Sequence, residues 1–354
     1  PPCHCPQLRS SLVISPEWHD ILSGRRRGFT ATCCRTLLSF AVPWYRGGVG
    51  LRNLAYDRGW LLAHRAGVPV ISVGNLTTGG VGKTPLVAWI VRELQRCGAH
   101  PVILSRGYGS RSAQGNDEQL VLEALCPGTP HLQNPDRVVG AQTAIAEHGG
   151  NVLVLDDGFQ HRRLARDLDL VLIDALLPWG YGSLLPRGLL REPPSSLQRA
   201  DLVAITRADQ VEPESLESLR QEIARWTSAP LLQLSFVPQR LINSAGETAD
   251  LSDFPGSHVA ALCGIGNPIA FRKTLARLGV ALPETRFRSY PDHYPFSGAD
   301  HAEIAAWLDS TAANLLLVTQ KDLVKLAVPR LGAAPVWAIE LAVEFQSGAA
   351  YLTE

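Results

Sequence analysis

The chain has 354 residues, of which 45% are hydrophobic and 19% are charged, and its 33 basic residues balance 33 acidic ones. This composition excludes a disordered chain, and the even charge balance argues against a nucleic-acid partner, which usually selects a basic excess. The seven cysteines are odd in number and irregular in spacing, so we expect a reducing compartment rather than a disulfide framework.

The first distinctive segment is the apolar stretch at residues 29–45, which follows the basic run at 25–27. It contains Arg35 and Pro43 and is shorter than the roughly 18 apolar residues that a membrane-spanning helix needs. Basic residues beside an aromatic-tipped helix suit a bilayer surface, whereas a helix packed on the protein's own core fits the same residues. Residues 1 to about 14 are left outside the fold prediction.

Short runs rich in Val, Ile and Leu then recur with helix-sized gaps between them. They barely alternate between apolar and polar residues, which is typical of strands buried on both faces. We therefore expect an α/β fold with a parallel sheet covered by helices. The predicted strands are residues 69–73, 101–105, 152–156, 170–174, 202–206 and 231–236, and the predicted helices between them include 84–97 and 213–226.

A polar, turn-rich stretch at residues 243–255 predicts a junction. Strand and helix patterns at 258–263, 268–278, 299–308 and 315–319 follow it and predict a second, smaller α/β unit. The predicted division is an N-terminal segment with a surface helix (residues 1–68), a phosphate-binding domain (69–242) and a smaller C-terminal α/β domain (243–354).

Residues 77–84 read TTGGVGKT and stand between a predicted strand and a predicted helix. A glycine-rich turn in this position aims backbone N–H groups and the positive end of the helix dipole at one point, as in phosphate-binding loops. We expect Lys83 to reach the β- and γ-phosphates of ATP and the Thr84 hydroxyl to bind Mg²⁺. The predicted nucleotide-binding residues are Thr77, Thr78, Gly79, Gly80, Val81, Gly82, Lys83 and Thr84.

Two carboxylates, Asp156 and Asp157, stand at the end of the predicted strand 152–156. An acidic residue at such a strand end can hold the Mg²⁺ of a bound nucleotide, directly or through water. Because adjacent side chains on a strand point to opposite faces, we expect one carboxylate to face the metal and the other a neighbouring loop. Alternatively, the two carboxylates cap the loop by accepting hydrogen bonds from its backbone.

Taken together, eight stretches between residues 69 and 330 resemble the tetraacyldisaccharide 4′-kinase (lipid A 4′-kinase) family and occur in the family's order. DDGFQHRRLARD (156–167) and LLPRGLLREP (184–193) are the most specific of them, because few other P-loop proteins carry either. The remaining matches are VGNLTTGGVGKTP (73–85), LSRGYG (104–109), NDEQ (116–119), CGIGNP (263–268), YPDHYPF (290–296) and TQKDLVKL (319–326).

The resemblance implies a kinase that transfers the γ-phosphoryl group of ATP, with Mg²⁺, to the 4′-hydroxyl of a tetraacyldisaccharide 1-phosphate in lipid A biosynthesis. It implies a lipid disaccharide substrate and peripheral contact with the cytoplasmic face of a bacterial inner membrane. This implication favours the bilayer-surface role for residues 29–45.

The resemblance also implies catalytic residues. Asp117 matches the Asp of the family's G-D-E-P motif and is the implied catalytic base, although Asn116 and Gln119 depart from that motif. His293 matches the first His of a D-H-H motif and is implied to pair with that Asp, while Tyr294 replaces the second His.

Further assignments follow from the same chemistry. Lys83 is the third predicted catalytic residue, because its charge can offset the charge that develops on the transferred phosphoryl group. Asp156 and Asp157 match the family's acidic pair near Mg²⁺. Arg187 and Arg191 are candidates for binding the acceptor's 1-phosphate or the triphosphate, with solvated surface charge as the alternative. Residues 319–322 are assigned no catalytic role, because Gln320 stands where many members have Glu.

The alternative function is that of a nucleotide-switch P-loop ATPase acting in metal or protein delivery. Residues 78–84 closely resemble the K-G-G-x-G-K-T loop of such ATPases. Thr78 takes the place of the first lysine of that loop, which counts against this alternative.

Overall fold

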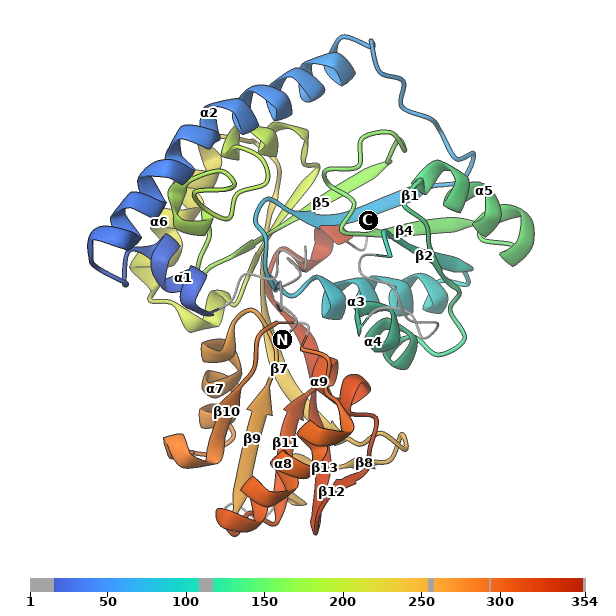
Figure 1. The fold of residues 1–354 in the computed structure, drawn as a ribbon. Helices are drawn as coiled ribbons and strands as arrows, with labels where there is room; N and C mark the ends of the chain where they lie inside the picture. The colour runs from blue at the N-terminus through green and yellow to red at the C-terminus, as the bar shows by residue number, and fades with distance from the viewer. Residues whose placement is uncertain (1–15, 108–116, 254–257, 293, 353–354) are drawn as a thin grey trace, which may run out of the picture.

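The computed structural model describes residues 16–107, 117–253, 258–292 and 294–352, which fold around a 13-stranded mixed sheet (Figure 1). The strand order along the sheet is β10-β9-β11-β13-β7-β6-β5-β1-β4-β2-β3. The strands of the first half are β1 (Val70–Asn75), β2 (Pro101–Ser105), β3 (His131–Gln133), β4 (Val152–Asp156), β5 (Leu168–Asp174), β6 (Leu202–Thr206) and β7 (Leu231–Ile242). Those of the second half are β8 (Thr248–Ala249), β9 (Val259–Cys263), β10 (Phe287–Ser289), β11 (Leu315–Thr319), β12 (Arg330–Leu331) and β13 (Ala334–Ser347).

The strands from β3 to β7 pair in parallel, which confirms the predicted α/β class. Every residue of β2, β4 and β6 is buried, as the unbroken apolar runs in these segments predict. Parallel pairing brings the carboxyl ends of β1 and β4 to the same edge of the sheet. The glycine loop after β1 and the aspartates after β4 therefore lie side by side, at the edge where α/β folds bind ligands.

The second half of the molecule joins the first through β7 and β13. Strand β7 runs six residues beyond the predicted segment 231–236, since it ends at Ile242, and it pairs antiparallel with β13 over most of its length. On the other side of β13, strands β11, β9 and β10 pair in parallel. Hydrogen bonds of one sheet connect the two predicted units. The predicted domain division at residue 243 stays a prediction.

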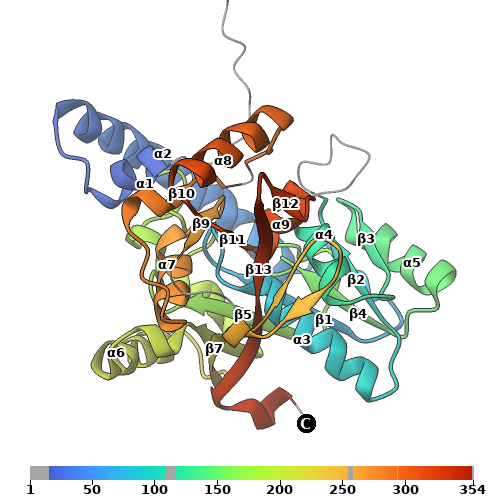
Figure 2. The ribbon, with the colours of Figure 1, turned by 90° about the horizontal axis from the view of Figure 1, so that it is seen from below.

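Helices cover both faces of this sheet. Helix α3 illustrates why they form: its residues Leu86, Val87, Ile90 and Val91, at helical spacing, are buried against the sheet. Helix α8 begins with a capping box between Ser297 and Asp300. The helices after β1 are α3 (Lys83–Arg96), α4 (Asp117–Leu125), α5 (Arg137–His148), α6 (Pro213–Ala224), α7 (Pro268–Arg277), α8 (Gly298–Ser310) and α9 (Gln320–Leu326). Figure 2 shows that α9, from the second half, lies against α4, from the first.

The N-terminal helices are α1 (Pro16–Ser23) and α2 (Phe29–Asp57), and α2 lies along the outside of the first half (Figure 1). Helix α2 has 29 residues, so it continues well beyond the predicted segment 29–45, with Pro43 inside it. Val42 and Tyr45 pack against a core cluster, whereas Phe40 and Trp44 are 71% and 84% exposed. One face of α2 is therefore packed and the opposite face is apolar and exposed. Within the described ranges, no helix has the length and apolar content to span a bilayer.

Candidate functional site

The glycine loop leads directly from β1 into α3. Gly82 adopts a left-handed backbone conformation with φ of 89°, and a Cβ atom there would lie 2.1 Å from Cζ of Phe236 on β7. Only glycine fits this turn, which points the first amides of α3 toward the loop. On the outside, the loop is held by residues 189–191: the Thr78 amide donates to the Leu189 carbonyl (2.8 Å), and the Arg191 amide donates to the Leu76 carbonyl (2.7 Å).

Three of the predicted site residues meet beside this loop. The Lys83 Nζ donates to Oδ1 of Asn75 (2.9 Å) and lies 3.3 Å from Oδ1 of Asp157. The Arg191 guanidinium donates to both carboxylate oxygens of Asp157, at 2.9 and 2.6 Å. Burial of Asp157 acts to raise its pKa, but the charges of Lys83 and Arg191 and their hydrogen bonds outweigh it and hold the pKa well below its usual range. Asp157 is therefore ionised at neutral pH.

The other two predicted metal-binding residues lie on neighbouring elements. Asp156 is the last residue of β4 and is 2% exposed, and Thr84 is the second residue of α3. Asp157 has a backbone φ of 57°, at the turn that directs its carboxylate to Lys83 and Arg191. Two cations already bind Asp157, whereas Asp156 and Thr84 carry a carboxylate and a hydroxyl that could serve as donors for a metal. Both are oxygen ligands of the kind that Mg²⁺ prefers. The described residues contain no group of three His, Cys, Asp or Glu side chains that could hold a metal by themselves.

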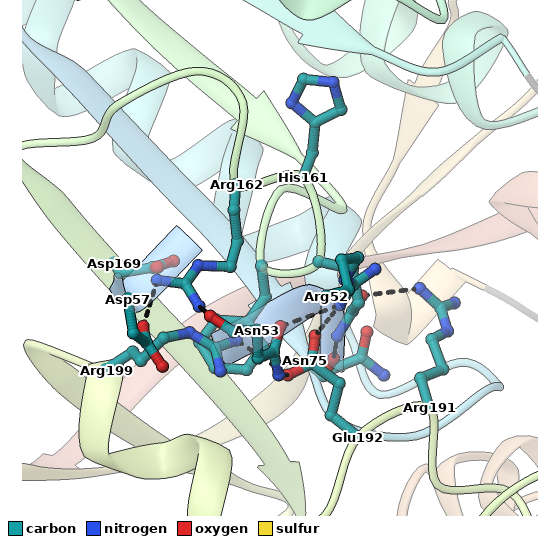
Figure 3. Close-up of polar contacts among 12 residues, drawn as sticks. Arg52, Asn53, Asp57, Asn75, His161, Arg162, Asp169, Arg191, Glu192 and Arg199 are labelled. Carbon is teal, nitrogen blue, oxygen red and sulfur yellow. Dashed lines mark hydrogen bonds and ion pairs between the residues drawn. The ribbon is translucent and has the colours of Figure 1, made fainter. Parts of the chain in front are cut away.

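An ion network around buried Glu192 connects α2 to the loop that carries Arg191 (Figure 3). Glu192 is fully buried and accepts from Arg52 (2.8 Å) and Asn53 (3.0 Å) of α2 and from Arg199 (2.9 Å). Burial acts to raise the pKa of Glu192, but Arg199 and the other donors lower it below its usual value. The Arg162 guanidinium adds bonds to Asp57 (2.7 Å) and to the Asn53 carbonyl (3.0 Å). The position of α2 is thus fixed relative to the nucleotide loop.

His161 projects away from this network (Figure 3), and we expect its protonation to destabilise the fold at low pH. Its burial, together with the charges of Arg137 and Arg166, lowers its pKa to about 4. The unfolded chain, with a His pKa near 6.5, binds the proton first as the pH falls, so stability decreases between roughly pH 6.5 and pH 4. The free energy of unfolding therefore falls on acidification, and we expect His161→Gln to make this fall smaller by about 1–3 kcal/mol. Urea unfolding at pH 7.5 and pH 4.5 measures it, and an unchanged difference between the two pH values would contradict the assignment.

The predicted base lies at the junction of α4 and α9. Asp117 is the first residue of α4, and its Oδ2 lies 3.9 Å from Nζ of Lys325 on α9. His293, its predicted partner, is outside the described residues, so their pairing stays a prediction. Tyr294 stands where the D-H-H motif has its second His. Its hydroxyl donates to Oδ1 of Asp300 (2.8 Å), in the first turn of α8.

Arg187 lies apart from the Lys83–Asp157–Arg191 cluster. Its guanidinium donates to the carbonyl of Leu22 in α1 (2.9 Å), so it is held at the base of the N-terminal helices. The two arginines that the sequence groups together therefore face different parts of the site.

Three residues that shape the loop were not predicted from the sequence. Asn75 ends β1, and its amide donates to the Thr77 carbonyl (2.5 Å) while its oxygen accepts from Lys83. The Gln160 amide donates to the Asn75 carbonyl (2.9 Å), and the Arg207 guanidinium donates to the Gly80 carbonyl (2.8 Å). Asn75 ends a strand and Arg207 directly follows another. Polar residues at the carboxyl ends of parallel strands are typical of a binding site, and this position could have identified both.

Comparisons with known proteins give one consistent family. The family model described as tetraacyldisaccharide-1-P 4′-kinase matches residues 34–353. A tetraacyldisaccharide 4′-kinase from Anaeromyxobacter sp. (strain K) is 39% identical over 314 residues, which cover 84% of this chain and 82% of the relative. One from Syntrophus aciditrophicus (strain SB) is 39% identical over 316 residues, covering 82% and 84%. The crystal structure of LpxK from Aquifex aeolicus in complex with ATP superposes with a TM-score of 0.72 at 31% identity, covering 90% of this chain and 98% of that one.

Proposed function

Because this chain belongs to the tetraacyldisaccharide-1-P 4′-kinase family, we propose that it transfers the γ-phosphoryl group of ATP to the 4′-hydroxyl of a tetraacyldisaccharide 1-phosphate, a step in lipid A biosynthesis. The observation that carries the proposal is the cluster of Lys83, Asp157 and Arg191 beside the glycine loop. The ATP complex of the relative from Aquifex aeolicus supports ATP as the phosphoryl donor.

The loop would bind the triphosphate through backbone amides and through Lys83. The amides of Thr78 and Val81 already donate to the carbonyls of Leu189 and Gly79, so the amides at residues 80 and 82–84 are the first candidates for phosphate oxygens. The Lys83 ammonium offsets charge on the transferred group, and Asp157 orients that ammonium together with Arg191. Thr84 and Asp156 would hold Mg²⁺, which would supply further neutralisation of the charge on the triphosphate.

The acceptor hydroxyl needs a base, because a sugar hydroxyl is a poor nucleophile at neutral pH. We assign this role to the Asp117 carboxylate, with His293 as its partner. Arg191 contacts Asp157 beside Lys83, which favours a role on the triphosphate side. Arg187 contacts α1, which favours a role in binding the anionic part of a lipid acceptor.

The exposed face of α2 would place the protein in peripheral contact with the cytoplasmic face of a bacterial inner membrane. Leu37, Phe40 and Trp44 are 70–84% exposed and recur at helical spacing. Arg25–Arg27 precede them, and cationic residues of this kind are attracted to anionic lipid surfaces. An apolar face beside basic residues is the pattern of a helix that lies in a bilayer surface.

Charged residues on this face should release the protein from vesicles. We expect Phe40→Glu/Trp44→Glu to reduce partitioning onto anionic phospholipid vesicles at least about tenfold, because burying each aromatic side chain is worth roughly 1.5–3 kcal/mol. Sedimentation with vesicles measures the bound fraction. Val139→Glu, at a half-exposed apolar position on α5, is the matched control. Equal partitioning of the double variant and the control would reject the assignment.

One assay tests the whole proposal. Purified protein is incubated with Mg²⁺, detergent, γ-labelled ATP and tetraacyldisaccharide 1-phosphate, and the label in the lipid is counted. We expect label in the lipid, its loss on chelation with EDTA and its return with added Mg²⁺. Hydrolysis of ATP without transfer to the lipid would instead support the nucleotide-switch ATPase.

A further inference from the structure

Lys325 is a nearly buried lysine for which the proposed reaction has so far no use. It belongs to α9, and its side chain is 6% exposed. Its Nζ lies 2.9 Å from Oδ1 of Asp322, donates to the Gly264 carbonyl (3.4 Å) and lies 5.5 Å from the centre of the Phe296 ring. A buried ammonium needs such partners, because it has lost most of its hydration.

Asp322 fixes the helix from which Lys325 projects. It is fully buried, and its Oδ2 accepts from the Gly264 amide (3.0 Å) and from the Thr319 hydroxyl (2.5 Å). The Thr319 hydroxyl in turn accepts from the Asp322 amide (3.2 Å) and caps the first turn of α9. The start of α9 is therefore bound to the end of β9, and the Lys325 ammonium has a defined position in the second half of the molecule.

The same ammonium reaches across to the first half. Its Nζ lies 3.9 Å from Oδ2 of Asp117, and α4 and α9 pack against each other (Figure 2). We propose that Lys325 is a positioning residue that holds the Asp117 carboxylate where the acceptor hydroxyl must deliver its proton. This inference rests on the proposed kinase function, since it assigns Lys325 a role in that reaction.

Two consequences follow from this arrangement. Asp117 is the first residue of α4, and Lys325 of α9 brings an ammonium of defined position to within 3.9 Å of its carboxylate. The ammonium attracts the carboxylate and so limits the directions in which the Asp117 side chain can point. The positioning role thus belongs to Lys325, three positions beyond residues 319–322. Those four residues were assigned no catalytic role from the sequence.

A purely structural role for Lys325 is the competing explanation, because Lys325 is also the counter-ion of buried Asp322. Replacing Lys325 alone would leave the Asp322 carboxylate buried without its counter-ion, which is strongly destabilising. The test therefore uses the Asp322→Asn background, in which the neutral amide oxygen can still accept from the Gly264 amide. The variants are Asp322→Asn, Asp322→Asn/Lys325→Met and Asp322→Asn/Lys325→Arg, with Lys273→Met on the exposed side of α7 as the control.

For each variant, kcat and KM for ATP are measured by transfer of label from ATP to the lipid, and ATP affinity by calorimetry. Relative to Asp322→Asn, we expect the Met double variant to lose about 10- to 100-fold in kcat, the cost of a misplaced catalytic group, with ATP affinity changed less than about threefold. The Arg double variant should recover most of this loss, and Lys273→Met should match the parent.

The outcomes separate this inference from the proposed function. If the parent protein transfers phosphate and the Met double variant keeps the kcat of Asp322→Asn, Lys325 is only a counter-ion and the inference is overturned. A parallel loss of ATP affinity and kcat would overturn it too, because it would show general disruption of the site. If the parent itself transfers no phosphate to the lipid, the proposed function fails and this inference fails with it.

Discussion

We expect Asp117→Asn to lower kcat for phosphoryl transfer by about 10²–10⁴-fold, the usual contribution of a positioned acid–base group, and to leave ATP affinity within about threefold of the parent. Asparagine keeps the shape of aspartate but cannot take the proton of the sugar hydroxyl. The nucleotide loop lies between β1 and α3, whereas Asp117 belongs to α4, so we expect the substitution to leave ATP binding largely intact. Steady-state transfer to the lipid gives kcat, and calorimetry gives the affinity for ATP.

Glu123→Gln is the matched control for this variant. Glu123 is exposed on the same helix and accepts from the Gln119 side chain, so its substitution removes one carboxylate from α4 without touching the α4–α9 junction. We expect it to keep parental kcat. An Asp117→Asn enzyme that retains more than about a tenth of the parental kcat would show that the base is another group.

We expect Lys83→Met to lower kcat/KM for ATP by roughly 10²–10³-fold, the scale seen when one preorganised donor to a developing charge is removed. The ammonium lies between Asn75 and Asp157 at the entry to α3, and no other residue of the loop carries a positive charge. The measurement is the initial rate of lipid labelling at low ATP concentration.

The double variant Lys83→Met/Asp157→Asn separates stability from catalysis. Loss of Lys83 removes one of the two cations that bind Asp157, so the single variant should also unfold at a lower temperature. Neutralising Asp157 should restore part of that stability while the rate stays low. A single variant with kcat/KM within about threefold of the parent would exclude the role assigned to Lys83.

Local patterns predicted the sheet and the loop well. Buried parallel strands and a glycine turn before a helix are encoded within a few residues, so the segments at 101–105, 152–156 and 202–206 coincide with β2, β4 and β6. The meeting of Asp157 with Arg191 is different, because 34 positions separate them along the chain. It depends on the strand order and on the turn at Asp157, and neither is visible in a local pattern.

Helix α2 and the stretch at 243–255 show the same limit. The sequence allowed residues 29–45 either a core or a surface role, and the folded chain shows a packed face with Tyr45 and an exposed face with Trp44. In the turn-rich stretch, the Asn243 amide donates to the Glu247 carbonyl (3.1 Å) and closes a hairpin between β7 and β8. The composition of this stretch predicted turns but not the pairing of β7 with β8, because the partner strand is not visible in a local pattern.

The buried network around Glu192 has a consequence for the choice of acceptor. Since Arg52 and Asn53 bind the residue next to Arg191, α2 cannot sink deeper or rise without displacing the loop that contacts Asp157. If α2 lies in the lipid surface as proposed, the distance between the reacting γ-phosphate of ATP and the acyl chains of the bilayer is constant. The enzyme would then select acceptors by the length of their headgroup: a single sugar would leave its hydroxyl too low, and a longer glycan would carry it past the reacting phosphate.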